Sequence, residues 1–132
     1  MARKWLVAII DDESDIVNLF RDALSKIDGL SIFTFTDPMV ALEHFKINKG
    51  AYALVISDLR MPGINGTDLV YKIKKENPLV RTLLMTAFEV DDKVFEEYVK
   101  NDIIDGFIQK PVKLRDLLSE VLKQVNIYKR IK

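Results

Sequence analysis

The chain contains no cysteine, and several other features are missing from its 132 residues. Without cysteine, disulfide bonds and thiolate metal sites are excluded, and a reducing compartment such as the cytoplasm is the expected location. Lys+Arg and Asp+Glu both number 20, so the chain lacks the basic excess that favours binding to nucleic acid or anionic membranes. No apolar run approaches the roughly 20 residues needed to cross a bilayer. We therefore expect a cytoplasmic protein that binds neither membranes nor, through this chain, nucleic acid.

Short apolar segments alternate with longer segments whose apolar residues recur at helical spacing. The predicted strands cover residues 4–10, 30–36, 52–57, 80–85 and 104–109. The predicted helices cover residues 14–27, 67–76, 91–100 and 113–126, with one more after Asp37, which precedes a proline at a first helical position. Strands alternating with helices in this way predict an α/β fold with one parallel sheet and helices on both faces.

A length of 132 residues, of which 48% are apolar, is enough for one domain with a hydrophobic core. We expect a single domain over residues 1–132, with its core between residue 4 and about residue 126. Residues 127–132 are expected to form a tail or the start of a linker. The sequence includes no separate output domain, so the chain is expected either to act by itself or to be part of a longer protein.

Polar residues follow four of the predicted strands directly. These residues are Asp11 and Asp12 after the first strand, Asp58 after the third, Thr86 after the fourth and Lys110 after the fifth. In open parallel sheets, ligands bind beyond the carboxyl ends of the strands. If these strands are neighbours, three carboxylates, a hydroxyl and an ammonium group meet at one edge of the sheet.

Each of these residues also has an ordinary explanation. Asp11 and Asp12 could be solvated charges at a helix start, Lys110 a surface lysine, and Thr86 a common strand residue. Asp58 favours a functional explanation over these ordinary ones, because a carboxylate at the end of an apolar strand needs a partner for its charge. Oxygen-bearing side chains suit Mg2+, which retains several water ligands. Three carboxylates and one lysine sum to a charge of minus two, which one divalent cation would neutralise.

Some neighbouring residues need no chemical role. Gly63 and Gly66 are expected to shape the loop after Asp58. His44, the only histidine, is expected to be a solvated helix residue. For Phe107, two roles stay open: static packing, or a change of rotamer together with the site.

With these motifs in view, the sequence resembles the receiver domain of two-component response regulators, such as the chemotaxis regulators. The matching segments are residues 8–13 (AIIDDE), 58–66 (DLRMPGING), 85–87 (MTA) and 107–111 (FIQKP), within a similarity that covers residues 4 to about 125. The resemblance implies a flavodoxin-like, doubly wound fold. Its strand order, 2-1-3-4-5, is that of the chemotaxis regulator and is taken over from the family.

The resemblance also implies roles for the polar cluster. Asp58 would accept a phosphoryl group from a phosphohistidine on a sensor histidine kinase or phosphotransfer protein. Mg2+, with Mn2+ as an alternative, would bind to Asp12, Asp58 and the backbone carbonyl of Arg60, with Asp11 acting mostly through water. Lys110 would pair with Asp58 and then with the phosphoryl group.

The same resemblance implies a conformational response. Thr86 would move toward the phosphoryl group, Phe107 would follow it inward, and the bond from Lys110 to Pro111 would be cis. The fourth helix and fifth strand would carry the output to an unknown effector, and these elements together with the fifth helix offer a surface for a homodimer. Such a chain is a signal receiver and not an enzyme, with at most intrinsic self-phosphorylation and autodephosphorylation.

One departure from the family pattern concerns the end of the fourth helix. Residues 102–104 (DII) stand where receivers commonly have Ala-Gly-Ala. Asn101 or Asp102 is therefore expected to supply the left-handed conformation that ends the helix.

Three alternative functions share parts of this pattern. A haloacid-dehalogenase-type phosphatase needs a second acid two residues after its nucleophile, where this chain has Arg60. A flavodoxin that carries FMN needs a Ser/Thr/Gly-rich loop after the first strand, where residues 11–13 (DDE) would repel its phosphate. A receiver-like interaction module that is never phosphorylated would not need the complete polar set, namely Asp11, Asp12, Asp58, Thr86 and Lys110.

Overall fold

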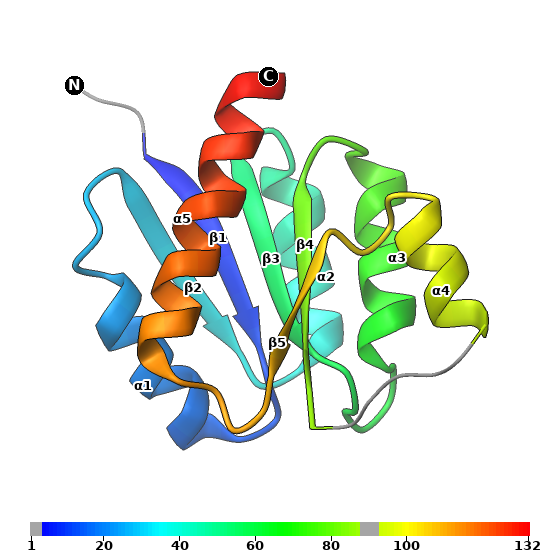
Figure 1. Ribbon diagram of the computed structural model, residues 1–132, viewed down its shortest axis with the longest axis horizontal. Helices are drawn as coiled ribbons and strands as arrows, with labels where there is room; N and C mark the ends of the chain where they lie inside the picture. The colour runs from blue at the N-terminus through cyan, green and yellow to red at the C-terminus, as the bar shows by residue number, and fades with distance from the viewer. Residues whose placement is uncertain (1–3, 88–92) are drawn as a thin grey trace.

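The computed structural model describes residues 4–87 and 93–132, which form a five-stranded parallel sheet between two layers of helices (Figure 1). The elements in chain order are β1 (Trp5–Ile10), α1 (Ser14–Leu24), β2 (Leu30–Phe35), α2 (Pro38–Asn48), β3 (Tyr52–Asp58), α3 (Gly66–Glu76), β4 (Arg81–Thr86), α4 (Lys93–Lys100), β5 (Gly106–Gln109) and α5 (Leu114–Ile131). The strands lie in the order β2-β1-β3-β4-β5. The predicted flavodoxin-like fold and the strand order 2-1-3-4-5 are therefore confirmed.

Two element ends differ from the prediction by three residues or more. Helix α1 ends at Leu24 and not at residue 27, whereas α5 continues through most of the predicted tail to Ile131. Tyr128 explains the longer α5, because its buried ring packs edge-on against Trp5 at 5.1 Å between centroids. Part of the predicted helix 91–100 falls on residues 91–92, which lie outside the described residues.

The two faces of the sheet have separate cores. Helices α1 and α5 cover one face, and α2, α3 and α4 lie on the other (Figure 1). Strand β3 is buried at every residue, as burial on both faces requires, which explains its nearly continuous apolar sequence. Within the described residues, we find no helix with the length and apolar character needed to span a membrane.

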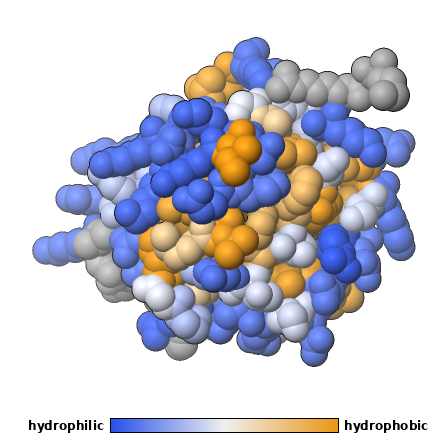
Figure 2. All heavy atoms as spheres, turned by 180° about the vertical axis from the view of Figure 1, so that it is seen from behind, coloured by the Kyte–Doolittle hydropathy of each residue, from blue (hydrophilic) through white to orange (hydrophobic). Residues whose placement is uncertain are grey.

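Helix α2 begins as the sequence predicts but is unusual on its outer side. The Asp37 carboxylate accepts a hydrogen bond from the Met39 N–H at 2.9 Å, and a proline is the first helical residue. Met39, Val40 and Ile47 are apolar but exposed. Figure 2 views the molecule from the side on which α2 lies, where apolar side chains reach the surface between polar ones. Because α2 is apolar on both sides, its helical periodicity in the sequence is weak.

His44 is not the solvated residue that the sequence predicts. Its side chain is half-buried on α2, and its Nδ1 atom is hydrogen-bonded to the Tyr52 hydroxyl at 2.7 Å. Its ring also lies 4.6 Å from Phe33 and 5.4 Å from Phe35, measured between centroids. The prediction was wrong because α2 packs this side of the helix against the strands before and after it, β2 and β3, whose aromatic residues surround the ring.

A buried ionic cluster joins α3, β4 and the turn before β5. Asp105 Oδ2 lies 2.8 Å from Lys74 Nζ, and Asp105 Oδ1 lies 3.4 Å from the Arg81 guanidinium. The Thr82 N–H also donates to Asp105, at 2.9 Å, and Arg81 Nε donates to Gln124 of α5 at 2.8 Å. This cluster ties the segment before β5 to α3 and β4, and through Arg81 to α5.

Asp102 supplies the left-handed conformation at the end of α4, with φ at 60°. The Ile103 N–H then donates to the Tyr98 carbonyl at 2.8 Å, as in a Schellman motif. An exposed aspartate in this conformation pays a steric cost that glycine avoids. We expect Asp102→Gly to raise the free energy of unfolding by roughly 1 kcal/mol, measured by urea denaturation. Asp102→Val should lower it, and a lower stability for the glycine variant would contradict this account.

Candidate functional site

The predicted polar residues meet at one end of the sheet. Asp11 and Asp12 follow β1, Asp58 ends β3, Thr86 ends β4, and Lys110 follows β5. Since β1, β3, β4 and β5 are consecutive neighbours in the sheet, their carboxyl ends lie side by side. The strand topology therefore brings together residues that are far apart in the sequence.

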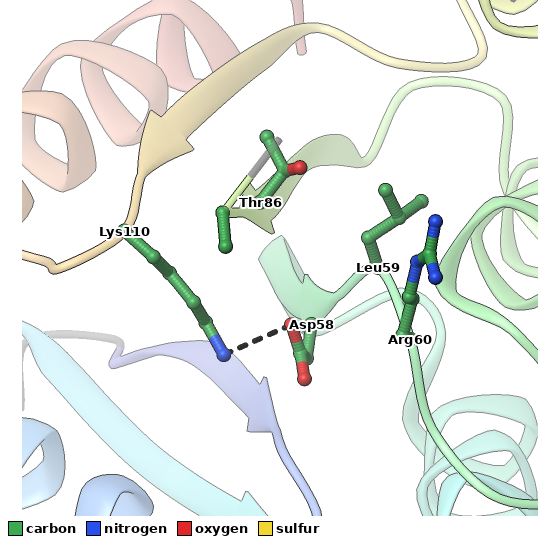
Figure 3. A pocket seen from close by; sticks show the side chains of 6 residues that line it. Asp58, Leu59, Arg60, Thr86 and Lys110 are labelled. Carbon is green, nitrogen blue, oxygen red and sulfur yellow. Dashed lines mark ion pairs between the residues drawn. The ribbon is translucent and has the colours of Figure 1, made fainter. Parts of the chain in front are cut away.

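Lys110 bridges two of the carboxylates. Its Nζ atom lies 3.0 Å from Asp58 Oδ1 and 3.4 Å from Asp11 Oδ2. Figure 3 shows the lysine side chain reaching toward Asp58 across the pocket. The lysine offsets one negative charge and leaves the remaining carboxylates without a full countercharge.

Asp11, Asp12 and Asp58 form an acidic cluster in which one carboxylate oxygen from each residue lies within 4.8 Å of the others. Asp11 is fully buried and Asp58 nearly so, whereas Asp12 is exposed. The Glu13 N–H donates to Asp11 Oδ1 at 3.0 Å and fixes its orientation. An oxygen-only ligand set that is partly open to solvent fits Mg2+, which keeps some of its own water.

The protonation equilibria of Asp11 and Lys110 are coupled to this arrangement. Burial raises the pKa of the Asp11 carboxyl above its ordinary value, and the Glu13 N–H and the Lys110 charge oppose this rise only in part. Burial tends to lower the pKa of Lys110, but its hydrogen bond to Asp58 and the charges of Asp11 and Asp58 outweigh that effect and raise it. Lys110 is therefore held as an ammonium ion, while the ionised Asp11 gains from a further cation.

A pocket of about 150 Å³ opens beside Asp58 and is lined by Asp58, Leu59, Arg60, Thr86, Ala87 and Lys110 (Figure 3). Pockets for drug-sized ligands are typically about 300–1,000 Å³. The pocket can hold a phosphoryl group and a few water molecules, but it is too small to enclose a nucleotide. Its size and its charged lining suit a small anion delivered from outside.

Thr86 and Phe107, the two residues predicted to move on phosphorylation, differ in how far they are buried. Thr86 lines the pocket and is 5% exposed, whereas Phe107 on the edge strand β5 is 39% exposed. The Lys110 N–H donates to the Thr86 carbonyl at 2.8 Å, which joins β4 to the end of β5. The Lys110–Pro111 peptide bond is cis.

Two residues beside Asp58 have contacts that the sequence reasoning missed. Ser57 is fully buried, and its hydroxyl donates to the backbone carbonyl of Asp58 at 2.9 Å. Gly66, expected only to shape a loop, lies directly against the same carbonyl group. A serine directly before Asp58, in an otherwise mostly apolar strand, was the signal available for Ser57.

Comparisons with known proteins agree with this geometry. A protein-family model described as "Response regulator receiver domain" matches residues 7–122. Regulatory protein VanRB of Enterococcus faecalis is 30% identical over 115 residues, which are 87% of this chain and 50% of that protein. The DNA-binding transcriptional regulator NtrC of Escherichia coli is 26% identical over 126 residues, 96% of this chain and 26% of that protein. The chain thus spans half or less of the length of these curated relatives.

Solved structures give the same result for the fold. A response regulator receiver domain protein from Clostridium thermocellum superposes with a TM-score of 0.84 at 26% identity, covering 97% of this chain and 99% of that chain. A CheY-like receiver domain protein from Methanospirillum hungatei superposes with a TM-score of 0.83 at 22% identity, covering 98% of this chain and 99% of that chain.

Proposed function

Because this chain belongs to the response regulator receiver domain family of two-component systems, we propose that it is a signalling switch controlled by phosphorylation of Asp58. Phosphorylation-based switching is the general function of the family. The observation that carries the assignment to Asp58 is its 3.0 Å ion pair with Lys110 inside the acidic cluster. This pairing places a carboxylate oxygen beside a cation at the mouth of a pocket of phosphoryl size.

The proposed reaction transfers a phosphoryl group from a phosphohistidine to Asp58. A carboxylate oxygen of Asp58 attacks phosphorus, the phosphorus–nitrogen bond breaks, and the imidazole leaves and takes up a proton. Lys110 holds the attacking carboxylate and then pairs with an oxygen of the bound phosphoryl group. Such transfers depend on in-line positioning and charge neutralisation more than on covalent chemistry of the protein.

Mg2+, or Mn2+ in its place, is the proposed cofactor, and receiver domains generally bind Mg2+ at an acidic pocket of this kind. Asp11, Asp12, Asp58 and the backbone carbonyl of Arg60 would hold it, with Asp11 acting mostly through water. The bound ion supplies neutralising charge for the phosphoryl oxygens. The close carboxylates, which repel one another without a cation, support this assignment.

The proposed response starts at Thr86, which lines the pocket. Its movement toward the phosphoryl group would allow Phe107 to turn inward, so that α4 and β5 present a changed surface. The same surface, with α5, is the proposed contact for a homodimer or an effector. Val99 of α4 and Leu122 of α5 are exposed apolar residues of these two helices. We propose residues 1–132 as a single domain without direct nucleic-acid contacts, acting in the cytoplasm and with at most intrinsic self-phosphorylation and autodephosphorylation.

The donor, a sensor histidine kinase or phosphotransfer protein, is proposed to dock over α1. A groove of about 230 Å³ lies there, lined by Glu13, Ile16, Leu19, Phe20, Lys110, Pro111 and Val112. Leu19 is exposed at its rim. Because Lys110 lines both this groove and the pocket, a donor seated in the groove would hold its phosphohistidine next to Asp58.

Binding of beryllofluoride with Mg2+ tests this function. We expect the wild-type chain to bind this phosphoryl mimic only when Mg2+ is present, with changes in amide NMR signals from the pocket through β5. Lys110→Ala should still bind Mg2+ but lose most of the spectral response, because the ammonium group that pairs with the mimic is gone. An unchanged response in this variant, or binding that persists after chelation of Mg2+, would contradict the proposal.

A further inference from the structure

Ser57 occupies an unusual place for a polar side chain. It lies in the central strand β3, where every residue is buried, and it is itself fully buried. Its hydroxyl donates to the backbone carbonyl oxygen of the next residue, Asp58, at 2.9 Å. A buried hydroxyl stabilises a fold only when its hydrogen bond offsets the cost of removing it from water. Here that hydrogen bond is made to the backbone of the proposed phosphoacceptor.

Gly66, the first residue of α3, closes the other side of the same carbonyl group. A Cβ atom placed on Gly66 would lie 2.2 Å from the Asp58 carbonyl oxygen, 3.1 Å from its carbonyl carbon and 3.0 Å from Leu59 Cα. All three atoms belong to the backbone, so no flexible side chain can move aside. Even alanine at residue 66 would therefore displace the backbone of Asp58 or the start of α3.

The backbone after Asp58 is fixed by two more hydrogen bonds. The Leu59 N–H donates to the Met85 carbonyl of β4 at 3.0 Å, and the Gly66 N–H donates to the Leu59 carbonyl at 2.8 Å. Strand β4 therefore holds the chain just after Asp58, and α3 holds it one residue later. The Asp58 carbonyl and the Leu59 N–H belong to one planar peptide unit. Met85 holds this unit on its N–H side, and Ser57 and Gly66 hold it on its carbonyl side.

We propose that Ser57 and Gly66 are positioning residues for phosphoryl transfer, acting through the Asp58 carbonyl group to aim the Asp58 carboxylate. This inference rests on the proposed function of Asp58. Two rotatable bonds connect that carboxylate to the backbone, so a turn of the backbone shifts its oxygens relative to Lys110 and the pocket. A misplacement of about 1 Å can slow a reaction roughly a hundredfold.

The test measures the rate of Asp58 phosphorylation by acetyl phosphate at saturating Mg2+ and saturating donor. We expect Ser57→Ala to slow this step roughly tenfold and Gly66→Ala roughly a hundredfold or more, with little change in Mg2+ affinity for Ser57→Ala. The 13C signal of the Asp58 carbonyl should shift in Ser57→Ala, since the hydrogen bond is lost. Ser57→Thr, which keeps the hydroxyl, should recover much of the rate.

Two matched controls separate positioning from general destabilisation. Gly50→Ala meets no atom within 4 Å, and Ser25→Ala removes an exposed hydroxyl that donates to the Arg21 carbonyl; both should keep the wild-type rate. If the wild-type chain is not phosphorylated, the proposed function fails. If it is phosphorylated and Ser57→Ala reacts at the same rate with an unshifted carbonyl signal, the positioning inference is overturned. Should Gly66→Ala not fold, the Ser57 variants decide the outcome.

Discussion

Replacing Asp105 with alanine is expected to lower the free energy of unfolding by about 3–5 kcal/mol. The Lys74 side chain is only 7% exposed and lies 2.8 Å from the Asp105 carboxylate, which is its ion-pair partner. Without that carboxylate, the ammonium group stays buried with no countercharge, and the Thr82 N–H loses an acceptor. Urea or guanidinium denaturation of the two proteins measures the difference.

An exposed ion pair provides the matched control. Lys49 Nζ and Glu76 Oε2 are 3.4 Å apart at the surface, and Lys49→Ala should cost less than about 1 kcal/mol. The double variant Lys74→Met/Asp105→Leu removes both buried charges and should recover much of the stability lost in Asp105→Ala. A loss in Asp105→Ala no larger than in Lys49→Ala would contradict the role of this cluster.

Asp58→Ala is expected to abolish phosphorylation of the chain by acetyl phosphate and Mg2+. The reaction needs a carboxylate oxygen that attacks phosphorus while acetate leaves, and Asp58 supplies the oxygen that lies 3.0 Å from Lys110 Nζ. Asp11 does not replace it, because its Oδ1 atom already accepts the Glu13 N–H and its side chain is fully buried. Intact-mass measurement should show one added phosphoryl group on the wild type and none on the variant.

The control for Asp58→Ala removes a carboxylate elsewhere. Asp116 is exposed in the first turn of α5, and Asp116→Ala should be phosphorylated like the wild type. Equal labelling of Asp58→Ala and wild type would refute the assignment of Asp58 as the acceptor. Phosphorylation of the wild type without Mg2+ would contradict the proposal that the acidic cluster acts in the reaction by binding Mg2+.

The location of the candidate site could be predicted because it depends on strand ends. Asp58, Thr86 and Lys110 each follow an apolar segment, and the carboxyl ends of adjacent parallel strands must meet. The order of those strands came from family resemblance, since the alternation of strands and helices does not determine which strands are neighbours. Periodicity therefore predicted the type of fold, and the four motifs predicted where its chemistry lies.

Contacts between distant polar residues could not be predicted in this way. Lys74 lies in α3, Arg81 in β4 and Asp105 in the segment before β5, and each alone has the sequence context of an ordinary surface charge. His44 was missed for another reason: its neighbours are near in the sequence, in β2 and β3, but the helical pattern alone did not show that its side of α2 faces their aromatic rings. For the left-handed residue that ends α4, the sequence left two candidates, Asn101 and Asp102. The backbone shows that it is Asp102, with φ at 60°.

The most direct test of the central claim is to map the phosphorylated residue in the wild-type chain. After treatment with acetyl phosphate and Mg2+, borohydride reduces an aspartyl phosphate to homoserine, which peptide mass spectrometry can place in the sequence. We predict homoserine at residue 58 and at no other aspartate. Homoserine at residue 11 or 12, or a wild-type chain that carries no acyl phosphate, would contradict the account.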